Sequence, residues 1–191
     1  LGRGGMGEVY MATHLRLPRR FAIKVLYPSI SLDPEQVARF RREAEIVSAL
    51  GHPNIVEVID FNYTPAGTPY IVMELLEGED LSSRIKRVGA LPVALAAAVL
   101  RQVTSALSAA HGRGIIHRDL KPRNIYLVAR QGDERDVVKV LDFGLSKVLR
   151  SETVVTRVQR TMGTPRYMAP EQALGHANRV DVRTDVFAMG I

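Results

Sequence analysis

The sequence predicts an α+β protein in two parts, and three observations lead to that fold class. Short segments with the apolar alternation of strands dominate residues 1–76. A polar stretch, Glu77–Asp80, comes next and is the expected link between the parts. Residues 77–191 carry a long apolar helix, predicted over residues 93–111, and one further strand pair. We therefore expect two domains, residues 1–76 and residues 77–191.

Two strand regions are predicted before the first helix. Residues 1–13 read as two short strands around a glycine-rich turn. Residues 20–27 read as a strand whose successive side chains point to opposite faces. Ala22 and Lys24 share one of these faces, so a small side chain lies beside a basic one.

The first long helix is predicted from Pro34 to about Leu50. Asp33 is the expected N-cap, Pro34 fits the first helical position, and Gln36 would complete a capping box. Gly51 is a natural stop at the C-terminal end.

Glu43 is expected on the inward face of this helix. Its helical spacing from Phe40 and Val47 places the carboxylate in an apolar stripe. Such a carboxylate is costly to bury unless it is paired, and Lys24 is the predicted partner. A surface glutamate with only local contacts is the alternative. Glu45 falls on the opposite face and is expected in solvent.

The remaining elements follow the same signals. Further strands are predicted over residues 55–61, 69–75, 125–128 and 137–141, the last two forming a hairpin. The helix over residues 93–111 is apolar on nearly every face, which predicts a central buried position. The long polar segment between Gly144 and Ala169 is expected to be functional or disordered.

Composition limits the classes of function. The chain has 191 residues, of which 46% are hydrophobic and 24% are charged, as in an ordinary globular protein. Its net charge is +6, but no nucleic-acid-binding motif is present, so no nucleic-acid partner is predicted. The absence of cysteine excludes disulfides and thiolate metal sites and favours the cytoplasm. No membrane segment is predicted, because no apolar run reaches about 18 residues.

A glycine-rich motif opens the chain. It reads G-x-G-x-x-G-x-V, with Gly2, Gly4, Gly7 and Val9 at the named positions. Glycines let backbone N–H groups approach a phosphate without a Cβ in the way. A dinucleotide-binding oxidoreductase shares the pattern but requires a helix directly after the last glycine. Residues 8–12 read as a strand instead, which favours a loop that covers phosphates.

Two further motifs carry the chemistry. Residues 117–124 read H-R-D-L-K-P-R-N, and residues 142–144 read D-F-G. Asp119, Asn124 and Asp142 are suited to holding a metal–phosphate complex and aiming a hydroxyl at it. These motifs match H-R-D-L-x-x-x-N and D-F-G of protein kinases. The chain resembles a bacterial-type (Hanks-type) serine/threonine protein kinase over essentially its whole length.

The resemblance implies a bilobal kinase-like fold, with a small antiparallel sheet in the N-lobe and a mostly helical C-lobe. It implies ATP and Mg²⁺ as cofactors, with Mn²⁺ as an alternative ion, and protein Ser/Thr hydroxyls as acceptors of the γ-phosphoryl group. Because the chain begins inside a motif and ends early in a helix, we expect a catalytic-domain fragment truncated at both ends. Asp185, in that helix, is expected to brace the backbone around His117 and Arg118.

The resemblance also assigns catalytic roles. Asp119 is the expected catalytic base, and Lys121 is expected to stabilise charge on the transferred phosphoryl group. Asn124 and Asp142 are the expected metal ligands. Lys24, paired with Glu43, is expected to bind the α and β phosphates.

The nucleotide pocket is predicted by the same resemblance. Met73 is the expected gatekeeper, the backbones of Glu74 and Leu76 are expected to bind the adenine edge, and Asp80 the ribose. The expected side chains around the adenine ring are those of Val9, Ala22 and Tyr126. Any fold would bury most of these apolar residues, so the set as a whole carries the prediction.

Regulation is predicted between D-F-G and residues 169–171, which read A-P-E. Thr156 and Thr161 are the expected phosphorylation sites, Arg118 and Lys147 the expected phosphate receiver, and Thr164 the substrate-docking residue. Autophosphorylation would require self-association. His117 and Phe143, with Val47 and Val58, fall where the family stacks a hydrophobic column.

Two other functions are compatible with parts of the sequence. A catalytically inactive, nucleotide-binding pseudokinase scaffold is the main alternative, although every required polar group is present. A small-molecule phosphotransferase is disfavoured because residues 163–171 resemble a peptide-docking loop. The resemblance is compatible with a cytoplasmic catalytic domain whose full-length protein is anchored in a membrane.

Overall fold

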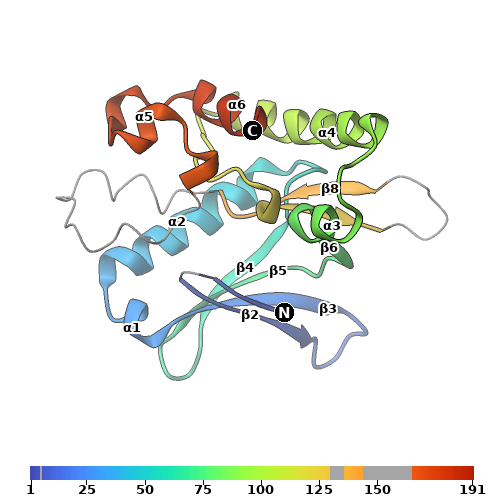
Figure 1. Cartoon of the computed structure of the whole chain (residues 1–191). Coiled ribbons are helices and arrows are strands. Elements are labelled where there is room, and N and C mark those ends of the chain that lie inside the picture. Colours follow the sequence, from blue (N-terminus) through green and yellow to red (C-terminus); the bar gives the residue numbers. More distant parts are fainter. Residues whose placement is uncertain (5, 130–135, 144–164) are drawn as a thin grey trace. The chain divides into compact units, whose positions relative to one another are not determined.

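The computed structural model has two compact units (Figure 1). It describes residues 1–4, 6–129, 136–143 and 165–191. One unit holds Leu1–Gly51 and Val56–Leu76, and the other holds His52–Ile55 and Glu77–Ile191. The first unit ends at Leu76, and His52–Ile55 belongs to the second unit, while the division into two domains stays a prediction. The predicted α+β class is correct.

The first unit is built on a five-stranded antiparallel sheet in the order β1-β2-β3-β5-β4. Its strands are β1 (Gly2–Arg3), β2 (Gly7–Thr13), β3 (Arg20–Leu26), β4 (Val58–Tyr63) and β5 (Pro69–Glu74). The glycine-rich motif therefore leads into a strand, which excludes the dinucleotide-binding alternative. β4 starts later than predicted because Ile55 forms a bridge to Val140 instead.

Helix α2 (Pro34–Leu50) covers this sheet and has the predicted ends. Asp33 Oδ1 accepts from the N–H of Glu35 at 2.9 Å, and Gly51 closes the helix at φ 52°. The predicted capping box is incomplete, because the N–H of Asp33 donates to the carbonyl of Ile30. Ile30 lies in a short helix, α1 (Pro28–Ser31), that the sequence did not predict. The core between α2 and the sheet contains Leu26, Phe40, Ala44 and Ile71.

The second unit contains a three-stranded antiparallel sheet in the order β6-β7-β8. Its strands are β6 (Gly78–Asp80), β7 (Ile125–Val128) and β8 (Val137–Val140), so the predicted hairpin is confirmed. The prediction that Glu77–Asp80 is only a link is wrong, because it pairs with β7. Gly78 is required there, since a Cβ at its φ of 154° would lie 2.0 Å from the carbonyl oxygen of Leu127.

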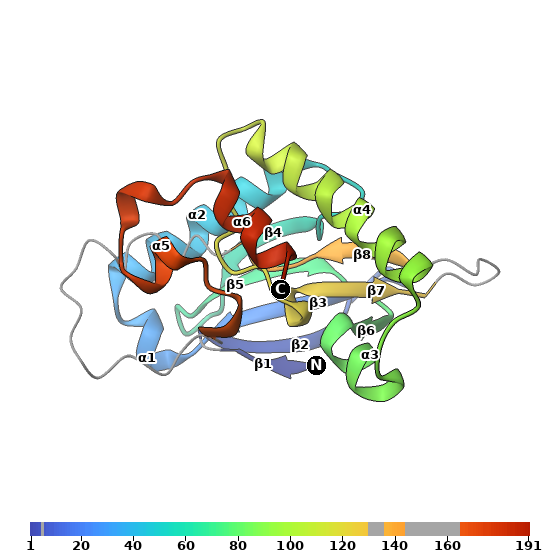
Figure 2. The same ribbon diagram turned by 45° about the horizontal axis from the view of Figure 1, so that its top comes forward.

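The helices of the second unit contain more residues than its sheet. It comprises α3 (Leu81–Val88), α4 (Val93–His111), α5 (Pro170–Ala173), α6 (Val182–Met189) and the 3₁₀ turns η1 (Pro122–Asn124), η3 (Pro165–Tyr167) and η4 (Ala177–Arg179). α6 lies beside α4 in both views (Figure 1, Figure 2).

Helix α4 is buried on one face only, which corrects the expectation of a helix buried all round. Val103 and Ala110 are fully buried, whereas Val93 is 85% exposed. Among the described residues, α4 is long and apolar enough to span a membrane by length and composition alone. Its packing on β8 and α6 is that of a helix in a folded unit. The absence of a membrane segment stays a prediction.

Side-chain hydrogen bonds explain why His52–Ile55 belongs to the second unit. The Nδ2 of Asn54 donates to the carbonyl of Val138 on β8 at 2.9 Å and to Oε1 of Gln102 on α4 at 3.0 Å. Gln102 Oε1 also accepts from the N–H of Val138 at 3.0 Å. One buried amide therefore fastens this loop to a strand and a helix.

Candidate active site

The catalytic loop brings three of the predicted side chains together. Nζ of Lys121 lies 2.8 Å from Oδ2 of Asp119. Nδ2 of Asn124 donates to the backbone carbonyl of Asp119 at 2.9 Å and approaches its Oδ2 at 3.4 Å. The turn η1 creates this geometry, because it returns Asn124 toward Asp119. Asp119 keeps a side-chain exposure of 21%, so its carboxylate reaches the surface.

A buried carboxylate braces the start of this loop from α6. Asp185 is 1% exposed, and its two oxygens accept from the N–H groups of His117 and Arg118, both at 2.8 Å. Oδ2 also lies 2.7 Å from Nε2 of His111. The predicted bracing contact is confirmed. It holds Arg118 at φ 63°, a left-handed conformation that non-glycine residues seldom adopt.

His117 connects the catalytic loop with the D-F-G segment. Its Nε2 lies 3.0 Å from the carbonyl of Leu141, and its Nδ1 accepts from the N–H of Asp119 at 3.2 Å. Complete burial holds the pKa of His117 below its ordinary value, because the charged imidazolium is disfavoured there. A neutral ring with its proton on Nε2 satisfies both contacts.

The same ring packs on Phe143. The two centroids are 4.7 Å apart, and both side chains are fully buried. This is the lower half of the expected hydrophobic column. Val47 and Val58 belong to the first unit, so the complete column stays a prediction.

The predicted metal ligands come from neighbouring backbone segments. The carbonyl of Asn124 accepts a hydrogen bond of 2.8 Å from the N–H of Leu141, the residue directly before Asp142. The amide nitrogen of Asn124 faces Asp119, so its Oδ1 is turned away from that residue. Asp142 has a φ of 47°, a left-handed conformation that non-glycine residues seldom adopt.

The donor set fits a magnesium ion bound together with phosphate. Within the described ranges, no group of three or more His, Asp or Glu residues is arranged to hold a metal ion. Asn124 Oδ1 and the Asp142 carboxylate would supply two hard oxygen donors, a partial shell whose metal binding stays a prediction. Mg²⁺ commonly keeps such a shell and completes it with water and phosphate oxygens.

In the first unit, Lys24 on β3 faces Glu43 on α2. Nζ of Lys24 lies 3.8 Å from Oε1 of Glu43, and the side chains are 13% and 9% exposed. The expected pair is therefore present, at a distance longer than a hydrogen bond.

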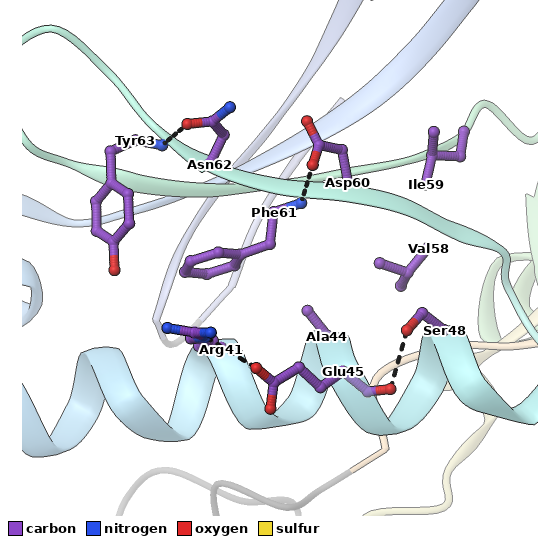
Figure 3. Close-up of a pocket in the computed structure, with 10 residues that line it drawn as sticks. All are labelled: Arg41, Ala44, Glu45, Ser48, Val58, Ile59, Asp60, Phe61, Asn62 and Tyr63. Carbon is purple, nitrogen blue, oxygen red and sulfur yellow. Dashed lines mark hydrogen bonds and ion pairs between the residues drawn. The ribbon is translucent and has the colours of Figure 1, made fainter.

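The opposite side of α2 is solvated, as expected for Glu45. Its Oε1 accepts from Nε of Arg41 at 2.8 Å, and the two side chains are 58% and 63% exposed. Figure 3 shows both residues, with Ser48, along a groove of about 510 Å³ between α2 and β4. Glu43 is not among the residues that line this groove.

The nucleotide-pocket residues of the first unit lie on adjacent strands. Ala22 is paired with Met73, and Val9 with Lys24. Glu74 follows Met73, and its Oε1 accepts from the N–H of Glu57 at 2.8 Å. This side-chain contact leaves the predicted adenine-binding roles of the Glu74 and Leu76 backbones untested.

Among the glycines of the loop, Gly7 has a structural requirement of its own. A Cβ there would lie 2.0 Å from the carbonyl oxygen of Val25. The packing of β2 against β3 therefore requires glycine at position 7, independently of any role in phosphate binding. Gly2 and Gly4 meet no such obstacle. A Cβ on Gly2 would have no atom within 4 Å, and the nearest atom to a Cβ on Gly4 would be Gly7 O at 3.7 Å.

In the second unit, Asp80 and Tyr126 are directly opposite one another on β6 and β7. Asp80 caps α3, because its Oδ1 accepts from the N–H of Ser83 at 3.0 Å and its Oδ2 from the hydroxyl at 2.6 Å. The hydroxyl of Tyr126 donates to the carbonyl of Gly78 at 2.8 Å. Asp80 therefore has a structural role as the cap of α3, and its predicted contact with the ribose stays a prediction.

Sequence reasoning missed Gln172 on α5. Its Nε2 donates to the carbonyl of Arg118 at 2.8 Å. Nothing in the sequence marked it, because a bond to backbone requires no matching side chain. Beside it, the carboxylate of Glu171 accepts a hydrogen bond from the hydroxyl of Thr184 on α6.

The predicted regulatory and docking residues mostly lie outside the described part of the chain. They are Thr156, Thr161, Lys147 and Thr164. Only Arg118 of the predicted phosphate receiver is described. Its backbone is fixed by Asp185 and Gln172.

Comparisons with known proteins identify the family of the chain. Residues 1–191 match the family described as "Protein kinase domain". The serine/threonine-protein kinase Pkn1 of Myxococcus xanthus is 48% identical, over 100% of this chain and 27% of Pkn1. The serine/threonine-protein kinase PknB of Mycobacterium leprae is 42% identical, over 100% of this chain and 30% of PknB. The chain thus spans less than a third of these two relatives.

A solved structure matches as well. The kinase domain of Mycobacterium tuberculosis PknI is 35% identical, with a TM-score of 0.73, over 99% of this chain and 68% of that one. The bilobal kinase-like fold class and the family resemblance are therefore correct. The chain belongs to the protein kinase domain family, among relatives of the bacterial serine/threonine type.

Proposed function

We propose that this chain transfers the γ-phosphoryl group of Mg-ATP to serine and threonine hydroxyls of protein substrates. The observation that carries the proposal is the contact of Lys121 and Asn124 with Asp119. A carboxylate, an ammonium and an amide within hydrogen-bond reach supply the groups that kinase chemistry needs beside the acceptor hydroxyl. Such enzymes act mainly by positioning and by neutralising charge.

Asp119 is the proposed base. Its Oδ2 lies against Lys121 while the carboxylate remains partly exposed, so it can accept a hydrogen bond from an incoming hydroxyl. Lys121 carries three donors, of which one reaches Asp119, and the others can serve oxygens of the transferred phosphoryl group.

Asn124 and Asp142 would hold the divalent ion. When bound, Mg²⁺ neutralises charge on the phosphate oxygens. We infer Mg²⁺ as the ion and Mn²⁺ as its alternative, since both accept hard oxygen ligands. Lys24, oriented by Glu43, would bind the α and β phosphates.

The test is γ-phosphoryl transfer to a Ser/Thr protein substrate by the full-length protein. Asp119→Asn is expected to lower kcat by at least about 100-fold, the usual loss for a general base. Glu45→Gln, on the solvated side of α2, serves as the control and should retain parental activity. A parent no faster than Asp119→Asn would instead indicate an inactive nucleotide-binding module. A cytoplasmic location and self-association for autophosphorylation stay predictions.

A further inference from the structure

The peptide group between Arg118 and Asp119 is hydrogen-bonded at both ends. Its carbonyl, on Arg118, accepts from Nε2 of Gln172 at 2.8 Å. Its N–H, on Asp119, donates to Nδ1 of His117 at 3.2 Å. Because this peptide leads directly into Asp119, its rotation would turn the side chain of the proposed base.

Arg118 needs such support, since its φ of 63° is an unfavourable conformation for a residue with a Cβ. Asp185 fixes the N–H of Arg118 at 2.8 Å. Gln172 fixes its carbonyl. Asp185 alone leaves the following peptide able to rotate about ψ. Gln172, together with the longer bond to Nδ1 of His117, restrains that rotation.

Gln172 also contacts the chain that leads into α5. Its Oε1 accepts from the N–H of Ala169 at 3.2 Å, and Ala169 is fully buried. One side chain therefore joins the backbone before α5 to the backbone before Asp119. The amide does this in one step, because it offers a donor and an acceptor at the same end.

We propose that Gln172 is a positioning residue that sets the orientation of Asp119. It makes the A-P-E segment and the catalytic loop one rigid piece. The role rests on the proposed function, since it acts through the proposed base. Gln172 itself touches no reacting atom.

Two variants separate this role from a merely structural one. Gln172→Glu keeps the acceptor for the N–H of Ala169 but cannot donate to Arg118 when ionised, whereas Gln172→Met keeps neither bond. In the full-length protein, kcat, the KM for ATP and hydrogen exchange of the Asp119 amide are measured. We expect both variants to lower kcat about 10-fold with an unchanged KM for ATP, as for a displaced catalytic group. Exchange at Asp119 should be faster in both.

The outcomes decide the proposal independently of the kinase assignment. If the parent outperforms Asp119→Asn while Gln172→Glu retains parental kcat and exchange, the positioning role is overturned and the kinase function stands. If the parent is inactive, unchanged exchange at Asp119 in Gln172→Glu still overturns the role. Should Gln172→Glu fail to fold, Gln172→Met is judged by the same measurements. A lower melting temperature with parental kcat per folded molecule would also refute the proposal.

Discussion

The two units hold their charged residues in different ways. In the first unit, Lys24 and Glu43 lie on separate elements, β3 and α2, and are 3.8 Å apart. In the second unit, the backbone before Asp119 is fixed by hydrogen bonds of 2.8 Å that Asp185 accepts and Gln172 donates. The comparison indicates a catalytic loop whose backbone is already fixed and a Lys24–Glu43 pair that is held less closely. We predict that nucleotide binding draws this pair together.

The largest expected effect comes from removing the brace of the assembled loop. Asp185→Asn replaces one of the two accepting oxygens by an NH₂ group, so one buried backbone N–H loses its acceptor, at a cost of about 1–3 kcal/mol. We expect kcat to fall by at least about 100-fold, since the geometry of the loop is lost. Asp181→Asn is the matched control, because Asp181 caps the same helix at an exposed position. Equal effects of the two changes would contradict an assembled loop.

The next effect concerns the adjustable pair. Glu43→Gln removes the charge that orients Lys24, and we expect kcat/KM for ATP to fall about 10-fold, equivalent to about 1.4 kcal/mol. Hydrogen exchange of the Asp119 amide should not change, because that loop belongs to the other unit. Faster exchange there would show that the two regions are not independent.

A smaller effect is expected at the loop His52–Ile55. Asn54→Ala removes donors to Val138 and Gln102 and should lower the free energy of unfolding by about 1–3 kcal/mol. Urea unfolding measures this free energy, with Asn62→Ala at an exposed position of β4 as the control. If Asn54→Ala were as stable as Asn62→Ala, the amide would not fasten this loop.

The smallest effect is a dependence on pH. The folded-state pKa of His117 lies below its ordinary 6.5, so the unfolded chain takes up a proton first as the pH falls. The stabilisation is complete above about pH 6.5 and decreases below it. Unfolding free energies at pH 7.5 and 5.5 should differ less in His117→Asn than in the parent. An identical difference in both proteins would exclude His117 as the titrating group.

The sequence predicted what local signals encode. Helix α2 has the expected ends, because a capping aspartate precedes Pro34 and a glycine follows Leu50. The contacts of Asp119 lie within one short motif, so their spacing could be interpreted directly. β6 was missed, because three polar or glycine residues at a sheet edge show no apolar alternation.

Long-range contacts to backbone groups were the least predictable. Gln172 and Asn54 both bond to carbonyls distant in sequence, and such bonds leave no pattern of matching side chains. The assignment of His52–Ile55 to the second unit follows from one of them. Gly7 illustrates a different difficulty. The motif predicts glycine there for phosphate binding, but the structure adds a steric reason, the carbonyl oxygen of Val25 on β3, that the sequence does not reveal.

A crystal structure of the full-length protein with Mg²⁺ and a non-hydrolysable ATP analogue tests the account most directly. We predict Asn124 Oδ1 and the Asp142 carboxylate at about 2.1 Å from one Mg²⁺. The contacts of Asp119 with Lys121 and Asn124 should be unchanged, and Lys24 should approach Glu43 to hydrogen-bonding distance. A metal ion held elsewhere, or a catalytic loop rebuilt around the nucleotide, would contradict the account.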